Sequence, residues 1–121
     1  MELETKTDFV RNHVKMWNKI IDLIKNESRI DGKTLSALKR TAFESLWPGD
    51  KCVSNNCFAC EWSNREINRK RKGKKYTAPE CKKCLFKVTY KKGCMNGLYN
   101  ELVETKNPVA VAKQIRDFPV K

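Results

Sequence analysis

Two Cys-x2-Cys pairs, Cys57/Cys60 and Cys81/Cys84, constrain this chain more than any other feature of its sequence. Two residues between cysteines let both thiolates of a tight turn face one point, and two such pairs complete a tetrahedral sulfur shell around zinc. The first residues are acidic and lead into no uninterrupted apolar run, so we expect no secretory signal and a reducing environment, where paired cysteines more often hold metal than form disulfides. The sequence therefore predicts one structural zinc ion bound by these four cysteines.

Two further cysteines, Cys52 and Cys94, exceed the number that such a shell needs. In one interpretation both are reduced, partly buried thiols, because free cysteine tends strongly toward burial. In the other, Cys94 is a ligand in place of Cys81 or Cys84, since the spacing permits that exchange. A second metal site is not expected, because His13 is the only histidine and falls on an apolar helical stripe, where a core role is predicted for it.

Helical periodicity governs the segment before the cysteines. Apolar residues recur every three or four positions from Asp8 to Lys25 and again from Lys33 to Trp47, as helices with one buried face require. A Pro-Gly-Asp sequence then ends the second segment, because proline cannot continue the helical hydrogen-bond ladder. We expect a helical hairpin with Trp17, Phe43 and Trp47 in its core.

The rest of the chain is predicted to be helical with one strand candidate. At Phe86–Tyr90, aromatic and β-branched residues alternate with polar ones, as in a half-buried strand. Leu98–Glu104 has the pattern of a short helix, and Asn107 before Pro108 is typical of a helix cap and first turn. The predicted fold is mainly α with a small zinc-ribbon-like β-hairpin, in a single zinc-stabilised domain. Its parts are a helical hairpin (8–47), zinc knuckles with a basic loop (52–94) and C-terminal helices (98–118).

Positive charge is concentrated around the cysteines. The formal charge of the chain is +12, and thirteen basic against three acidic residues between Lys51 and Gly93 account for +10 of it. Because each base that neutralises a phosphate releases counterions, a loop at 65–75 is predicted to bind nucleic acid with little sequence preference. Trp62 and Tyr76 flank this loop and could stack on unpaired bases. The predicted nucleic-acid-binding residues are Arg65, Arg69, Lys70, Arg71, Lys72, Lys74, Lys75 and Tyr76.

Two other interpretations of the basic loop stay open. In the first it is a solvated, flexible loop whose charges serve only solubility, because basic runs are common and no recognition helix is evident. In the second the same charges attract an acidic protein, since opposed charge patches accelerate encounter whatever the partner is.

Known zinc and cysteine chemistries do not fit the pattern. Zinc deaminases have proline directly before Cys-x-x-Cys, whereas Glu80 stands between Pro79 and Cys81. A cysteine nucleophile needs a partner base, and His13 lies far away in the sequence, on a predicted core face. A shell of four thiolates leaves no open position for water. We therefore predict no catalytic residue and no enzymatic activity.

Four segments together resemble a known group of proteins: residues 13–18, 57–62 and 81–84, and Cys94 with the Gly-Leu-Tyr at 97–99. They are similar to small cysteine-rich accessory proteins of tailed phages and prophages of Gram-positive bacteria. The resemblance implies an accessory phage protein in the cytoplasm of the host cell and implies no reaction. It also implies that Cys94 joins the metal site, because the cysteine nearest the Leu-Tyr segment recurs in that family.

The function expected from the sequence is binding. The leading hypothesis is a phage accessory zinc-binding protein that binds nucleic acid non-specifically through the basic loop, in the cytoplasm of the bacterial host. The alternative is a host-directed inhibitor, a counter-defence or host-takeover protein, that binds an acidic bacterial protein. Neither a membrane nor a small-molecule substrate is an expected partner.

Overall fold

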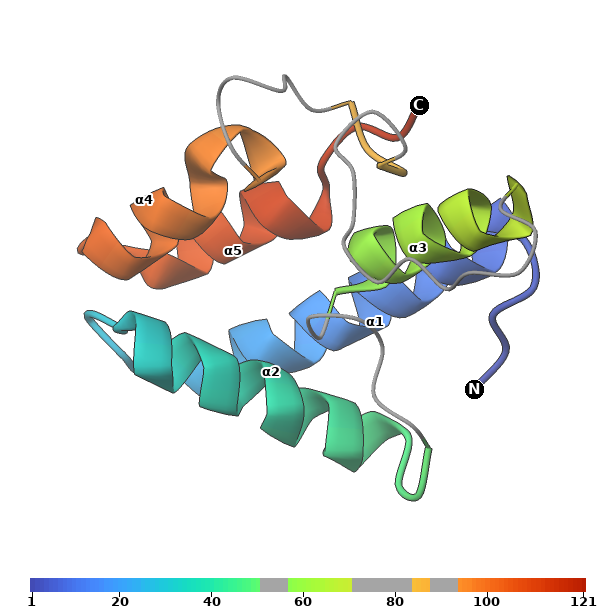
Figure 1. The fold of residues 1–121 in the computed structure, drawn as a ribbon. Helices are drawn as coiled ribbons and strands as arrows, with labels where there is room; N and C mark the ends of the chain where they lie inside the picture. Colours follow the sequence, from blue (N-terminus) through green and yellow to red (C-terminus); the bar gives the residue numbers. More distant parts are fainter. Residues whose placement is uncertain (51–56, 71–83, 88–93) are drawn as a thin grey trace.

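The computed structural model describes residues 1–50, 57–70, 84–87 and 94–121, without the side chains of residues 67–70 and of Cys94. Helix α1 runs through the middle, α2 is antiparallel to it on one side, and α4 and α5 lie on the other side (Figure 1). Helix α1 contacts α2, α3 and α5. The elements are α1 (Lys6–Ile24), α2 (Gly32–Leu46), α3 (Phe58–Lys70), a 3-10 turn η4 (Cys94–Gly97), α4 (Leu98–Glu104) and α5 (Pro108–Arg116).

A reciprocal cap starts helix α1. The Thr5 hydroxyl accepts a hydrogen bond from the Asp8 N–H (3.2 Å), and the Asp8 carboxylate accepts from the N–H groups of Thr5 (2.9 Å) and Glu4 (3.0 Å). These backbone hydrogen bonds hold the pKa of Asp8 well below its usual range, at about 2. Donors that the first helical turn leaves without partners are thereby satisfied.

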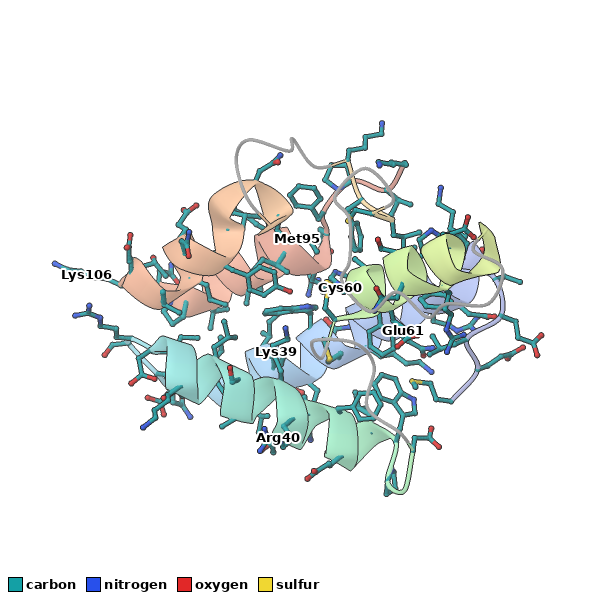
Figure 2. All side chains as sticks on the ribbon, viewed as in Figure 1. Lys39, Arg40, Cys60, Glu61, Met95 and Lys106 are labelled. Atoms are coloured by element: carbon teal, nitrogen blue, oxygen red, sulfur yellow. The ribbon has the colours of Figure 1, made fainter. Side chains whose placement is uncertain are left out.

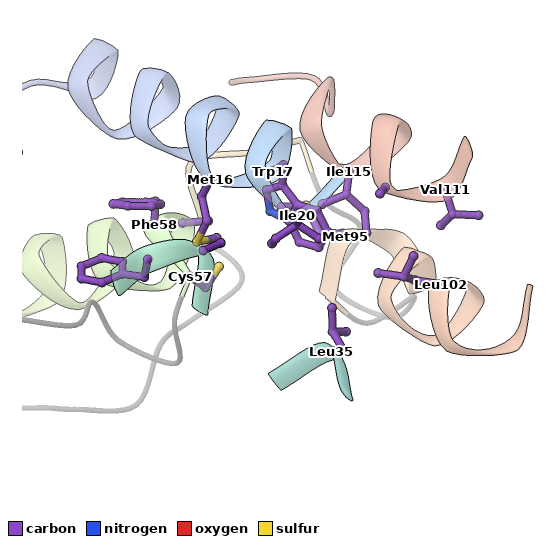
Figure 3. Close-up of a cluster of buried hydrophobic side chains, with 14 of the residues drawn as sticks. Met16, Trp17, Ile20, Leu35, Cys57, Phe58, Met95, Leu102, Val111 and Ile115 are labelled. Atoms are coloured by element: carbon purple, nitrogen blue, oxygen red, sulfur yellow. The ribbon is translucent and has the colours of Figure 1, made fainter. Parts of the chain in front are cut away.

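The buried face of α1 forms the centre of the hydrophobic core. Its Trp17 and Ile20 are fully buried, and Met16, which the sequence pattern did not single out, is buried with them. Residues from α2, α4 and α5 close over this face in Figure 3. Phe43 is also fully buried, so the core roles predicted for Trp17 and Phe43 are confirmed, whereas Trp47 is half-buried.

Helix α2 begins and ends with local signals that the sequence carries. The Asp31 side chain accepts from the Thr34 N–H (2.7 Å) at its start. At its end the Asp50 N–H donates to the Trp47 carbonyl (3.1 Å) across a tight turn, in which Gly49 has a φ of 82°. Glycine takes this left-handed conformation without the steric cost that other residues meet. The predicted helical hairpin is confirmed.

The two C-terminal helices also match their predicted positions. Helix α4 has the predicted bounds, and α5 begins with Pro108 behind the Asn107 side chain, which accepts from the Ala110 N–H (3.3 Å). Before α4 the backbone turns through left-handed conformations at Met95 (φ 53°) and Asn96 (φ 54°). This reversal places Met95 in the core, 1% exposed.

The predicted zinc-ribbon β-hairpin is wrong for the part of the chain that the structure describes. The residues after Cys57 form helix α3, because Phe58 and Ala59 bury one face of it in the core. Glu61 and Arg65, one turn apart, add an ion pair at 2.9 Å on the same helix. The mainly α class agrees with the prediction.

The strand predicted at Phe86–Tyr90 lies partly outside the described residues, which stop at 87 in this segment. Phe86 forms an isolated antiparallel bridge with Val120 near the C-terminus. Leu85 and Phe86 are adjacent and both only 1% exposed, whereas a half-buried strand would turn successive side chains to opposite faces. The only strand-like feature that the structure describes in this segment is the bridge at Phe86.

Among the described residues, none of the helices has both the length and the apolar character that crossing a membrane would require.

Candidate metal centre and basic segment

The first cysteine pair lies at the N-terminal end of α3. Cys57 directly precedes the helix and is 4% exposed, and Cys60 lies in its first turn, half-buried. Phe58 anchors this turn, with its ring centroid 5.4 Å from that of Trp47 and 6.3 Å from that of Phe43. Figure 3 shows Cys57 and Phe58 in the same buried cluster, and Figure 2 shows Cys60 where α3 begins. Cys57 is thus part of the core, and Cys60 packs against it.

The surroundings of Cys57 favour its thiolate form. The Cys60 thiol donates a hydrogen bond to the Cys57 sulfur, and together with the nearby charge of Lys39 and the N–H groups of Cys60 and Ala59 it lowers the pKa of Cys57 to about 6. Burial acts in the opposite direction and raises this pKa. Since the N-terminus of a helix carries a partial positive charge, the position itself suits an anionic sulfur.

The chemistry of this pair fits zinc. Thiolate sulfurs are preferred zinc ligands, and two sulfurs that hydrogen-bond to each other already approach one point. Cys57 and Cys60 could therefore supply two of the four sulfurs that a tetrahedral zinc shell needs.

The structure places the other predicted ligands only in part. Cys84 is described; it is half-buried and packs against the same core. In the described ranges no group of three or more histidine, cysteine, aspartate or glutamate residues could hold a metal ion, so Cys84 is not gathered with the first pair there. Cys52 and Cys81 lie outside the described residues, and so does the side chain of Cys94.

The core role predicted for His13 is confirmed. It is 1% exposed, its Nε2 donates to the Ile115 carbonyl (2.9 Å), and its ring lies 4.6 Å from that of Phe86. Burial lowers the pKa of His13 to about 4. The imidazole is therefore neutral at pH 7 and joins α1 to α5.

The basic run predicted as a loop begins as helix. Residues 65–70 belong to α3, and residues 71–75 and Tyr76 lie outside the described part of the chain. Arg65 donates to Glu61 (2.9 Å) and to the Leu3 carbonyl (2.7 Å), and it lies over the Phe9 ring, 5.2 Å from the centroid. Its guanidinium thus has partners within the chain.

Trp62, predicted as a stacking residue, packs edge-on against Phe9 with a centroid distance of 5.2 Å and is half-buried. One residue near the cysteines was missed altogether. Lys39 of α2 is half-buried, its ammonium lies 5.0 Å from the centre of the Tyr99 ring, and its charge acts on Cys57. The sequence carried a signal for it, because Lys39 stands one turn after the buried Leu35 within the apolar stripe of α2.

Comparison of the chain with protein families, with curated proteins and with solved structures finds no match.

Proposed function

We propose that the chain holds one zinc ion through Cys57, Cys60, Cys81 and Cys84 and binds nucleic acid through the basic segment. The basic segment is residues 69–75, with Tyr76 beside it; Arg65 is left out because it has partners within the chain. The proposed setting, an accessory protein of a phage in its bacterial host, comes from the family resemblance alone.

One observation carries this proposal: helix α3 begins directly after Cys57 and continues to Lys70. A helix of this length spans about 20 Å at 1.5 Å per residue. The thiol pair and the first bases of the segment therefore belong to one rigid element. Metal binding at one end would fix the direction in which the other end presents its charges. Zinc would supply structure here and would take no part in a reaction, because four sulfur ligands leave no open position.

The test measures how the affinity for a DNA duplex depends on salt. Each phosphate that a base neutralises contributes about 0.9 to the slope of log K against log salt concentration. In a variant with Arg69, Lys70, Arg71 and Lys72 replaced by glutamine, we expect the slope to fall by about 3 to 4. Fluorescence anisotropy with a labelled duplex, at several salt concentrations between roughly 50 and 200 mM, gives the slope.

A matched control distinguishes the effect of losing bases of the basic segment from the effect of lowering the net charge. Its four substitutions, also to glutamine, remove exposed bases of the described helices and loops: Lys25, Lys33, Arg40 and Lys106. We expect its slope to stay within about one of the wild-type value. Equal slopes in all three proteins would contradict the proposal. So would a pull-down from host lysate that recovers one stoichiometric protein after nuclease treatment and no nucleic acid before it, because that result identifies an acidic host protein as the partner.

A further inference from the structure

A groove between α1 and the end of α2 contains none of the predicted binding residues. Its volume of about 390 Å³ falls within the range of small-molecule sites. Its lining combines basic, amide, acidic and aromatic side chains: Lys15, Asn18, Lys19, Asp22, Leu46 and Trp47.

The wall from α1 offers donors for phosphate oxygens. Lys15 and Lys19 lie one helical turn apart on the same face, and neither makes an ion pair or hydrogen bond within the described part of the chain. The side-chain oxygen of Asn18 accepts from Arg116 (3.0 Å), which leaves its amide hydrogens available as donors. Two ammonium groups that have no partner among the described residues, on one wall of a groove, attract an anion.

The wall from α2 offers an aromatic surface. Trp47 is half-buried, and its ring is held at 5.1 Å from the Phe43 ring and 5.4 Å from the Phe58 ring, measured between centroids. Its backbone N–H donates to the Phe43 carbonyl (2.9 Å), which fixes its position at the end of α2. A tryptophan that is held on one side and lines a groove on the other can stack on a base with little loss of entropy.

We propose that this groove binds an unpaired nucleotide of a single strand, with its base against Trp47 and neighbouring phosphates on Lys15 and Lys19. The inference rests on the proposed nucleic-acid binding and names single strands as its substrate. In a duplex both faces of each base are stacked and the pairing edge is occupied, so the Trp47 surface has no partner there. The Asp22 carboxylate repels phosphate and accepts hydrogen bonds from base N–H groups, so it favours one orientation of the nucleotide.

The test compares single-stranded and duplex 12-mers, as DNA and as RNA, by fluorescence anisotropy with the full chain. Trp47→Leu should weaken single-strand binding by about 5- to 150-fold, the range expected for one stacked base, and should change duplex binding less than twofold. Lys15→Gln with Lys19→Gln should lower the single-strand salt slope by about 1.4, at roughly 0.7 per phosphate contact. The matched control, Lys25→Gln with Lys33→Gln, should leave the slope unchanged.

The lysine variant keeps the test decisive if Trp47→Leu unfolds, because both lysines lie at the surface of α1 and a melting curve verifies its fold. If single strands and duplexes bind with equal affinity and the lysine pair has no effect, the proposed nucleotide site in the groove is contradicted and the basic segment remains as the binding site. If the wild-type chain binds neither form, the groove and the proposed function both fall.

Discussion

At the scale of single residues, polar side chains inside the core set the chemistry of this molecule. His13 is buried as a neutral imidazole, and Cys57 is buried with a hydrogen-bond donor and a positive charge beside its sulfur. The sequence predicted the first, because an apolar stripe surrounds His13 on α1. It did not predict that the charge of Lys39 acts on Cys57, because these two residues lie in different segments of the chain and only the tertiary fold brings them together.

His13 should make the stability of the protein depend on pH. Its pKa is lowered from 6.5 to about 4 in the folded state, so between these values the unfolded chain binds more protons than the folded chain. The stabilisation is complete above about pH 6.5 and is lost as the pH falls toward 4, by roughly 3 kcal/mol in total. Urea unfolding at pH 7.5 and 4.5 measures the loss.

A His13→Gln variant serves as its control, because glutamine keeps an N–H donor and does not titrate. We expect this variant to lose clearly less stability than the wild type between the two pH values. An equal loss in both proteins would show that other groups cause the pH dependence.

At the scale of elements, the helices with strong local signals could be predicted and α3 could not. The two helices of the hairpin and α5 combine an apolar stripe with a cap or a proline at a boundary, and these signals act within a few residues. Helix α4 has no side-chain cap, and its prediction came from its residue pattern alone. Helix α3 begins at the cysteine pair, where the spacing favours a turn, and its sequence is mostly polar after Phe58 and Ala59. At Phe86, where the sequence predicts the start of a strand, the described residues form one isolated antiparallel bridge with Val120.

The cap of α1 should contribute measurably to stability. Thr5→Ala removes the hydroxyl that accepts from the Asp8 N–H, and we expect a loss of about 1 kcal/mol in the free energy of unfolding. Thr5→Ser retains the acceptor and should stay within about 0.5 kcal/mol of the wild type. Chemical denaturation of the three proteins at pH 7.5 gives both values. If alanine and serine are equivalent, the cap seen at Thr5 does not stabilise the helix.

At the scale of the whole molecule, contacts between distant segments fix the arrangement around α1. The N-terminal amine pairs with Asp50 at 2.9 Å, and Lys6 donates to the carbonyl of Lys121 at the other end of the chain. His13 and Asn18 bond to α5. No local pattern encodes such contacts, which is why the sequence predicted most helices but not how the second half of the chain returns to the first.

The proposed zinc site depends on both local and long-range structure. The start of α3 supplies two sulfurs, and two more must come from elsewhere in the chain. Structural zinc can supply on the order of 10 kcal/mol of apparent folding energy at neutral pH. For a chain in which a third of the residues are charged, such a contribution would be a large part of the total. The proposed function therefore depends on metal bound by these thiols.

Native mass spectrometry, on protein purified without chelator, tests that claim most directly by weighing the intact chain and counting its metal. We predict one zinc ion per wild-type chain, and none in a variant with Cys57 and Cys60 replaced by serine. A wild-type chain without metal, or one whose mass shows the cysteines oxidised in pairs, would contradict it.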